Sequence, residues 1–406
     1  MTAKIIRGST IICGVDDDGR AEELADGAIL VEDGIIKETG DPAALIDAAP
    51  DAEVIGGDAF VVFPGLVNAH HHIGITPFQL GAPDLPLELW LIERMGTRAV
   101  PWRLDTLYSA FELVRSGVTT VQHLHNRVPG GPDEICDAAA QVIGAYRDIG
   151  MRVSYSYCLR DRNRIVYGDD DAFLATLPPD LASELDAAIA PLKLSIDGNI
   201  EAFERLTESY VDAADVAVQL APLNFQWCSE AALERIADAA RRHDASVHMH
   251  LLETPYQRAF ARRETGSSPL KTLERFGLLN SRMTLGHGVW TTDDDLDAIA
   301  STDTRICHNC SSNMRLKSGT APVNAMLSRG IKVAIGIDEA GINDDRDMFA
   351  EMRQVLNWHR PPGHQAPAPT PADVFKMASE YGALSTGFGA RIGRIEPGRA
   401  ADIVLL

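Results

Sequence analysis

Residues 229–250 read SEAALERIADAARRHDASVHMH, and this stretch indicates the fold of the chain. Ser229 is suited to cap a helix whose apolar face includes Leu233 and Ile236. Residues 245–250 follow as a short apolar strand that ends in a histidine. A helix that leads directly into such a strand is one repeat of an architecture with a parallel sheet covered by helices.

Two other stretches repeat this pattern. Residues 322–338, PVNAMLSRGIKVAIGID, predict a helix that ends at Gly330 and then a buried strand with Asp338 at its end. Residues 283–300, MTLGHGVWTTDDDLDAIA, predict a strand that ends in a histidine and then a capped helix. In a chain of 406 residues, such repeats predict an α/β fold with one closed (β/α)8 barrel of the TIM type.

The two ends of the chain have a different rhythm. Short β-rich runs broken by Gly and Asp fill the N-terminal part, for example IIRGSTIICG at residues 5–14, and the tail GRIEPGRAADIVLL returns to short β signals. We therefore expect residues 1–58 and 375–406 to form a small composite β-sandwich, with the barrel at residues 59–374 inserted between its two halves.

Composition excludes some classes of partner. The chain has 37 Lys and Arg against 58 Asp and Glu, a formal net charge of −21, so its surface repels nucleic acid and anionic lipid. No apolar run approaches the length of a membrane span, and the start MTAKIIRGST lacks a signal-peptide core. The six cysteines are sparse, which is typical of free thiols in the cytoplasm. The pair Cys307 and Cys310 has zinc-knuckle or redox spacing, but no second pair accompanies it.

Three consecutive histidines follow the apolar run at residues 61–69. Residues two apart on an extended strand end point the same way, so His70 and His72 can bind one ion while His71 points away. A polar turn after the strand is the alternative for these three residues taken alone.

Other ionisable residues end further predicted strands: His250, His287 and Asp338. The carboxyl ends of barrel strands meet at one mouth, and several imidazoles with one carboxylate are typical of a zinc or iron(II) site with an open position. Glu253 lies three residues after His250. If the chain turns helical there, Glu253 lies beside the metal without binding it, where it can move protons.

These residues belong to motifs that cover nearly the whole chain in order: PGLVNAHHH, SGVTTV, VHMHLLET, LGHGV, ICHNCSSNMRLKSGTAPV, VAIGIDEAGINDDRDMFAEMR and IEPGRAADIVLL. Together they resemble the amidohydrolase superfamily, in the branch of metal-dependent deaminases and chlorohydrolases that act on purines, pterins, cytosine and s-triazines. The segment DLPLELWL is similar to that branch as well.

The resemblance implies a metal-dependent aminohydrolase that deaminates a small nitrogen heterocycle by attack of metal hydroxide, and a homodimer. It implies one divalent ion per chain, with Zn2+ expected ahead of Fe2+, bound by His70, His72, His250 and Asp338. Glu253 would be the proton shuttle, His287 would hydrogen-bond or polarise the attacking water, and Asp338 would help to deprotonate that water.

A further set of residues is expected to contact the substrate: Gln79, Trp90, His123, His125, Trp227, His308, Asn313 and Glu339. Several have an alternative. The two tryptophans either stack on a flat ring or belong to the core, and the H-x-H pair at 123–125 is a second metal site, a substrate contact or a pair of core histidines. His71 and His248 are expected to pack near the metal, and His243, His359 and His364 are expected at the surface.

Two other functions stay open. Gln79, Leu223 and Glu339 depart from the pattern of many members of the branch, which leaves room for displacement of chloride, an alkylamine or a thiol from a triazine, urea or carbamate. Leu223 also argues against an adenosine-like substrate. The third possibility is a non-catalytic binding relative, which would be expected to lack metal ligands.

Overall fold

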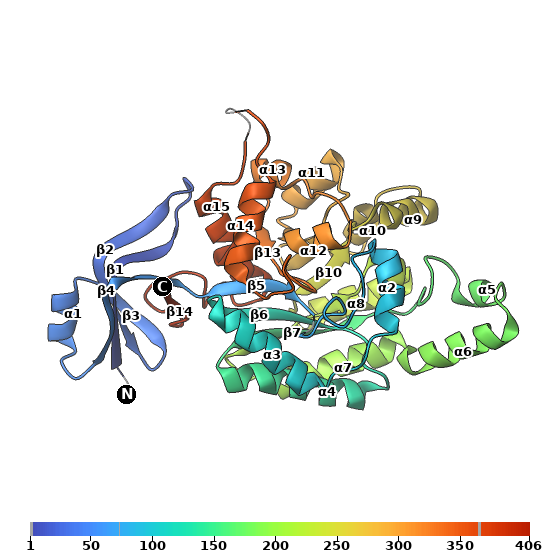
Figure 1. Cartoon of the computed structure of the whole chain (residues 1–406), viewed down its shortest axis with the longest axis horizontal. Helices are drawn as coiled ribbons and strands as arrows, with labels where there is room; N and C mark the ends of the chain where they lie inside the picture. The colour runs from blue at the N-terminus through green and yellow to red at the C-terminus, as the bar shows by residue number, and fades with distance from the viewer. Residues whose placement is uncertain (1–2, 73, 364–366) are drawn as a thin grey trace.

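A computed structural model describes residues 3–72, 74–363 and 367–406. It has two parts: a sheet built from both chain ends, and a larger ring of strands surrounded by helices (Figure 1). Six cysteines are free, four of them buried. Among the described helices, none combines the length and the apolar character needed to cross a bilayer.

The larger part is built on two parallel sheets. Their strands are β5 (Leu66–His71), β6 (Val118–His125), β7 (Arg152–Leu159), β8 (Val216–Val218) and β9 (Ala221–Pro222), and then β10 (Val247–Leu251), β11 (Met283–His287), β12 (Arg305–His308) and β13 (Val333–Ile335). Parallel bridges join the sheets, from Leu220 to Val247 and from Asn224 to His250 on one side and from His71 to Asp338 on the other. The ring is therefore closed, and the predicted TIM-type α/β barrel is confirmed.

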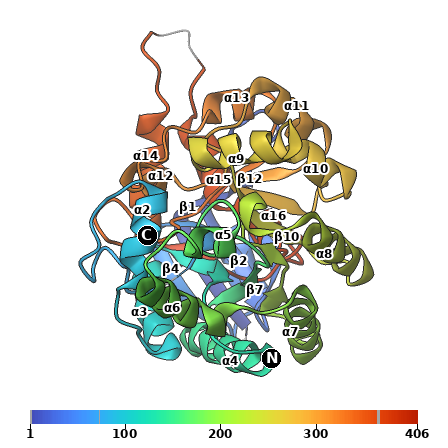
Figure 2. The ribbon, with the colours of Figure 1, turned by 90° about the vertical axis from the view of Figure 1, so that its right-hand side faces the viewer.

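Helices surround this ring (Figure 2). They are α2 (Leu87–Met95), α3 (Trp102–Arg115), α4 (Pro132–Ile149), α5 (Asp170–Leu174), α6 (Pro179–Ile189), α7 (Ile196–Ser209), α8 (Glu230–Arg242), α9 (Pro255–Thr265), α10 (Pro269–Arg275), α11 (Asp293–Ser301), α12 (Cys310–Arg315), α13 (Val323–Ser328), α14 (Met348–Trp358), α15 (Pro371–Ala378) and α16 (Glu380–Ser385), with 3-10 turns at Ala190–Leu192 and Phe225–Trp227. In Figure 2, α5 and α6 lie in front of the ring, across one end of the barrel.

The opening stretch folds as its pattern predicts. The Ser229 side chain accepts a hydrogen bond from the backbone N–H of Ala232 and so caps α8. Leu233 and Ile236 are fully buried against the barrel, and β10 follows with His250 near its end. Local capping and the 3.6-residue apolar period together fix this unit.

The smaller part is one five-stranded sheet in the order β14-β4-β1-β2-β3. Its strands are β1 (Ala3–Val15), β2 (Ala21–Glu32), β3 (Ile35–Gly40), β4 (Glu53–Pro64) and β14 (Ile403–Leu405), and α1 (Pro42–Ala48) follows β3. Neighbouring residues of β1 belong to different hydrophobic clusters. Ile5 packs with Leu45 of α1, and Ile6 packs with Ile395 from the tail. Both chain ends thus share one sheet, while a second sandwich layer and the domain boundaries stay predictions.

Candidate active site

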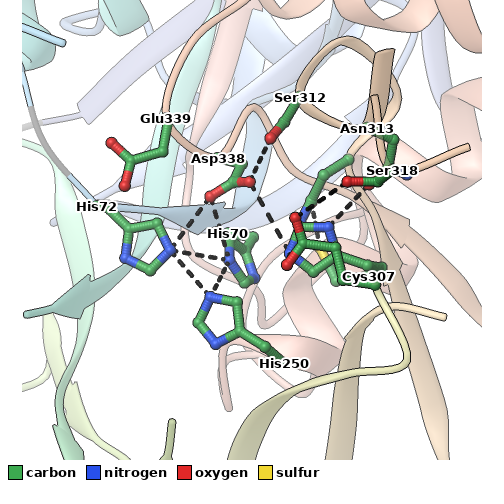
Figure 3. Close-up of polar contacts among 12 residues, drawn as sticks. His70, His72, His250, Cys307, Ser312, Asn313, Ser318, Asp338 and Glu339 are labelled. Carbon is green, nitrogen blue, oxygen red and sulfur yellow. Dashed lines mark hydrogen bonds and ion pairs between the residues drawn. The ribbon is translucent and has the colours of Figure 1, made fainter. Parts of the chain in front are cut away.

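Three histidines meet at the barrel mouth. The Nε2 atoms of His70 and His72 lie 3.2 Å apart, those of His70 and His250 3.1 Å, and those of His72 and His250 3.0 Å (Figure 3). His70 and His72 come from the end of β5 and His250 from β10, so strand ends far apart in sequence place these rings together. All three rings are buried.

The other ring nitrogens fix which atom of each histidine is free. Nδ1 of His72 contacts the carbonyl oxygen of Leu124 at 2.7 Å, and Nδ1 of His250 contacts that of Leu223 at 2.8 Å. A carbonyl only accepts, so each Nδ1 carries the proton and donates, and each Nε2 is left with a lone pair. Nδ1 of His70 lies 2.8 Å from Nε2 of His248, which therefore packs beside the site as expected. Lone pairs that face one another at this distance fit a cation between them.

Asp338 completes the ligand set. Its Oδ1 lies 3.1 Å from Nε2 of His72 and 3.5 Å from Nε2 of His70. Its Oδ2 accepts a hydrogen bond from Ser312 Oγ at 2.5 Å. Burial opposes ionisation, but the surrounding imidazoles of His72, His287 and His250 outweigh it, so the pKa of Asp338 lies below its ordinary value. Three imidazole nitrogens and an ionised carboxylate are a complete protein ligand set for one divalent metal.

His287 and Glu253 lie beside this set. Nε2 of His287 is 3.8 Å from Glu253 Oε2 and 3.8 Å from Asp338 Oδ2. One ligand atom of His287 also lies within 4.8 Å of those of His70, His250 and Asp338. Nδ1 of His287 donates to Asn313 Oδ1 at 2.8 Å. Both distances from Nε2 are too long for a direct hydrogen bond, and Asn309 Nδ2 lies 3.3 Å from the same nitrogen.

Glu253 lies in the turn between β10 and α9, not in a helix. Thr254 caps α9, so the helical turn considered from the sequence begins after Glu253. The carboxyl group is buried and accepts from Ser318 Oγ at 3.3 Å. Burial, together with the charges of Asp338 and Glu88, raises the pKa of Glu253 to about 7, against the lowering effect of His287. A carboxyl group with that pKa can both accept and donate a proton near neutral pH.

Two glycines leave room for the side chain of His70. A Cβ on Gly336 would lie 2.4 Å from Cβ of His70, and a Cβ on Gly286 would lie 3.0 Å from its Cε1. His287 directly follows Gly286, and Asp338 lies two residues after Gly336. Their φ values are positive, 71° for His287 and 61° for Asp338. Backbone in this region is strained for such residues, and such strain clusters at functional sites.

A cavity of about 1060 Å³ opens from this cluster. His72, His250, Glu253, His287 and Asp338 form part of its wall. Much of the remaining wall is apolar, and α2, α5, α6 and the α5–α6 connection contribute to it, with Leu89, Ile92, Phe173, Leu177, Leu181, Leu185 and Ile189 among the lining residues. The two helices across the barrel end in Figure 2 therefore roof the space in front of the metal ligands.

Three of the expected substrate contacts line this cavity: Trp90, Trp227 and Glu339. Glu339 Oε1 forms a buried ion pair with Arg94 Nη1 at 2.9 Å, and Arg94 lies over the Trp90 ring at 5.5 Å. Glu339 thus belongs to the cavity wall, and Arg94 is its counterion there. The sequence does not predict a role for Arg94, because its partner Glu339 is distant in sequence.

Other expected contacts lie elsewhere. Gln79 is held by Thr76, Tyr108 and Asp344 and is not part of the cavity wall. His123 and His125 are buried and lie outside the cavity wall.

Nδ1 of His123 contacts the Tyr146 hydroxyl at 3.0 Å, and Nδ1 of His125 contacts that of Tyr155 at 2.7 Å. These are core histidines, the third of the alternatives left open for this pair. The tyrosines that pair with them lie on α4 and β7.

Histidines outside the ligand set divide into three cases. His243 is exposed, as predicted, but the prediction of a surface position for His359 is wrong: only 5% of it is exposed, because its ring packs on His308 with an Nε2–Nε2 distance of 2.9 Å. His308 is therefore not in the cavity wall. His364 lies outside the described residues. His71 is buried and lies at the bridge to Asp338.

Asn313 contacts His287 and not the cavity, so it positions a catalytic candidate. The sequence analysis missed Ser312, Ser318 and Arg94, which contact Asp338, Glu253 and Glu339. Ser312 and Ser318 belong to the motif ICHNCSSNMRLKSGTAPV, but no local signal in the sequence assigns a partner to either hydroxyl.

Comparison with known proteins matches residues 61–406 to the amidohydrolase family model. The chain belongs to the amidohydrolase family. Among curated members, a 5'-deoxyadenosine deaminase of Methanothermobacter thermautotrophicus is 31% identical over 94% of this chain and 80% of its own. An 8-oxoguanine deaminase of Pseudomonas aeruginosa is 31% identical over 94% of this chain and 82% of its own.

A solved structure also matches. The adenosine deaminase from Xanthomonas campestris with bound zinc has a TM-score of 0.78 and 26% identity, covering 100% of this chain and 84% of that one. The resemblance to the deaminase branch of this amidohydrolase family is thereby confirmed.

Proposed function

We propose that this amidohydrolase is a metal-dependent aminohydrolase that releases ammonia from a nitrogen heterocycle. The carrying observation is the position of Glu253, whose buried carboxyl group lies 3.8 Å from His287, next to a complete ligand set. The relatives named as deaminases of 5'-deoxyadenosine and 8-oxoguanine support the reaction type. In that reaction water adds to the amine-bearing ring carbon, the bond to the amine breaks, and the products are an oxo ring and ammonia.

His70, His72, His250 and Asp338 would hold one divalent ion at this site, which would supply Lewis acidity and lower the pKa of bound water. We propose Zn2+ ahead of Fe2+, because a relative carries zinc and because imidazole and carboxylate ligands suit both ions. The Nδ1 atom of each of the three histidines has a partner, and these contacts would orient Nε2 toward the ion.

Glu253 moves the protons in this proposal. Its pKa of about 7 lets it take one from the attacking water and pass it to the ring nitrogen or to the leaving amine. Ser318 steadies one carboxyl oxygen and leaves the other directed at the His287 side. His287 keeps a lone pair on Nε2, because Asn313 holds the proton on Nδ1, and the attacking water would share this acceptor with Asn309 Nδ2, which lies 3.3 Å from it.

The size and lining of the cavity suit a heterocyclic ring that bears a substituent. Its volume of about 1060 Å³ lies just above the usual range for sites of drug-sized ligands, about 300–1000 Å³. The apolar wall from α5 and α6 lies on the side away from the metal ligands, where a substituent would extend. Trp90 and Trp227 supply aromatic surface, and Glu339 supplies a carboxylate that can accept from a ring N–H or an amino group.

The test is ammonia release from a substrate panel with the purified, metal-loaded protein. The panel pairs bare rings (guanine, 8-oxoguanine, cytosine, isocytosine, a pterin, melamine) with substituted ones (5'-deoxyadenosine and adenosine). Turnover of at least one member, lost in Glu253→Gln, is expected. Failure of every member to release ammonia would contradict the proposal. Product masses that report loss of chloride, alkylamine or thiol from triazine substrates would favour the displacement reaction instead.

We propose further that the protein acts in the cytoplasm as a homodimer. Free, mostly buried thiols support a reducing compartment. Light scattering coupled to size-exclusion chromatography measures the mass directly, and a mass near 44.0 kDa would contradict the dimer.

A further inference from the structure

Behind the active site, three buried side chains bring metal-binding atoms together. His308 ends β12, Cys310 begins α12, and His359 follows α14. One ligand atom from each lies within 4.8 Å of the other two. Each residue is at most 5% exposed. The cluster is distinct from the catalytic one: none of its members lines the cavity or belongs to the ligand set above.

The geometry repeats that of the catalytic ligand set. The Nε2 atoms of His308 and His359 face each other at 2.9 Å, close to the 3.0–3.2 Å between the Nε2 atoms of the catalytic histidines. A tetrahedral zinc ion with bonds of about 2.0–2.1 Å to nitrogen holds two such atoms about 3.3 Å apart, so a small opening of the pair accepts the ion. A hydrogen bond between the two rings alone does not account for the buried thiol of Cys310 beside them.

We propose that His308, Cys310 and His359 bind a second metal ion, a thiophilic divalent ion such as Zn2+. Imidazole nitrogen and thiolate sulfur are both ligands that zinc binds, and a water would complete a four-coordinate shell. The chain then carries two ions, one more than its sequence predicts. Of the CHNC pair, only Cys310 takes part, because Cys307 turns toward Asn309, with Sγ 3.6 Å from its Oδ1.

The second ion would position the catalytic groups without touching them. It would pin the start of α12 to the end of α14, and α12 carries Ser312 and Asn313, which hold Asp338 and His287. Asn309, between the two ligands on the β12–α12 segment, lies 3.3 Å from Nε2 of His287 through its own Nδ2. Loss of this ion would therefore loosen the residues that orient the active site.

Cobalt substitution tests the proposal separately from activity. The catalytic ligand set offers only nitrogen and oxygen, so near-ultraviolet sulfur-to-cobalt charge-transfer absorption in the Co2+-loaded protein reports the second site alone. We expect that absorption in the unaltered protein, with two ions per chain by elemental analysis. In Cys310→Ser the absorption should vanish and the stoichiometry should fall to one. His359→Gln should likewise bind one ion, which covers the case in which Cys310→Ser fails to fold.

Cys307→Ser is the matched control, since Cys307 is equally buried, is three residues away and lies outside the cluster. It should keep both ions and the absorption. One ion per chain in the unaltered protein, or the absence of sulfur-to-cobalt absorption, would overturn the proposal. So would absorption that survives Cys310→Ser.

Discussion

The side-chain oxygen of Asn313 accepts a hydrogen bond from Nδ1 of His287 at 2.8 Å, and this contact decides which face of the imidazole is free for catalysis. With the proton held on Nδ1, Nε2 keeps the lone pair that faces Glu253 and Asp338. Orienting partners of this kind typically contribute tenfold to a hundredfold to metal affinity or activity.

We therefore expect Asn313→Leu to lower turnover by about tenfold to a hundredfold, because His287 loses its fixed tautomer. Metal content at the catalytic site should not change, since Asn313 contacts none of the four ligands. Steady-state kinetics with metal analysis checks this. Asn313→Asp, which keeps the acceptor, should recover much of the rate, and a rate equal to that of Asn313→Leu would contradict the orienting role.

Metal binding and proton transfer should be separable. Glu253→Gln should keep the fold and the metal while turnover falls by roughly a hundredfold to ten-thousandfold, the usual contribution of a general acid–base group. His70→Ala should instead lose the catalytic metal, because it removes one of few ligands. Metal stoichiometry and turnover of both variants are the measurements. Loss of metal from Glu253→Gln, or full activity, would refute the shuttle assignment.

Asp338→Asn should lower turnover by at least about a hundredfold, because the variant loses a ligand charge and an acceptor for the water proton. Three imidazoles remain, so part of the metal should be retained at saturating Zn2+. Titration with Zn2+ followed by an activity assay separates weak metal binding from lost chemistry. Full rescue of activity by excess metal would limit Asp338 to the role of a ligand.

Glu351 predicts a pH dependence of stability. It is buried on α14 and accepts from Ser311 N at 3.0 Å and Ser311 Oγ at 2.5 Å. Burial outweighs these bonds and raises its pKa from 4.5 to about 7. The folded state therefore binds more protons than the unfolded state between these values, and the contribution of Glu351 is present below pH 4.5 and lost as pH rises through 7, on the order of 3 kcal/mol.

Glu351→Gln should flatten that dependence, since the amide can pair with Ser311 at every pH. The measurement is the free energy of unfolding by urea at pH 5 and pH 8 for both proteins. The difference between the free energies of unfolding at pH 5 and pH 8 should be smaller in the variant. Glu208→Gln, at an exposed carboxyl on α7, is the control, and an equal change in both variants would contradict the assignment to Glu351.

The barrel and the convergence of the candidate metal ligands could be predicted because both follow from local periodicity. The unit made of the Ser229-capped helix and β10, which carries His250 near its end, has counterparts along the chain, and parallel strands in a closed ring bring their ends together. His70, His72 and Asp338 then converge without any knowledge of distant contacts.

The substrate contacts could not be predicted in the same way. His123 and His125 have the same H-x-H spacing as His70 and His72, yet hydroxyl groups of Tyr146 and Tyr155 hold them in the core. Spacing gives the direction of a side chain on a strand, whereas its partner depends on which distant element packs there. The surface position predicted for His359 is wrong for the same reason, because its ring packs against His308, fifty-one residues away in sequence.

The barrel closes where β5 meets the end of β13, and the described backbone contacts there include the bridge from His71 to Asp338 and the hydrogen bond from Asp338 N to His70 O at 2.8 Å. The proposed catalytic ion has ligands on both sides of this seam, His70 and His72 before it and Asp338 after it. Such an ion would link the first strand of the ring to the last as a cross-link does. Amide hydrogen exchange at β5 and β13 should accordingly speed up on chelation well before the rest of the barrel responds.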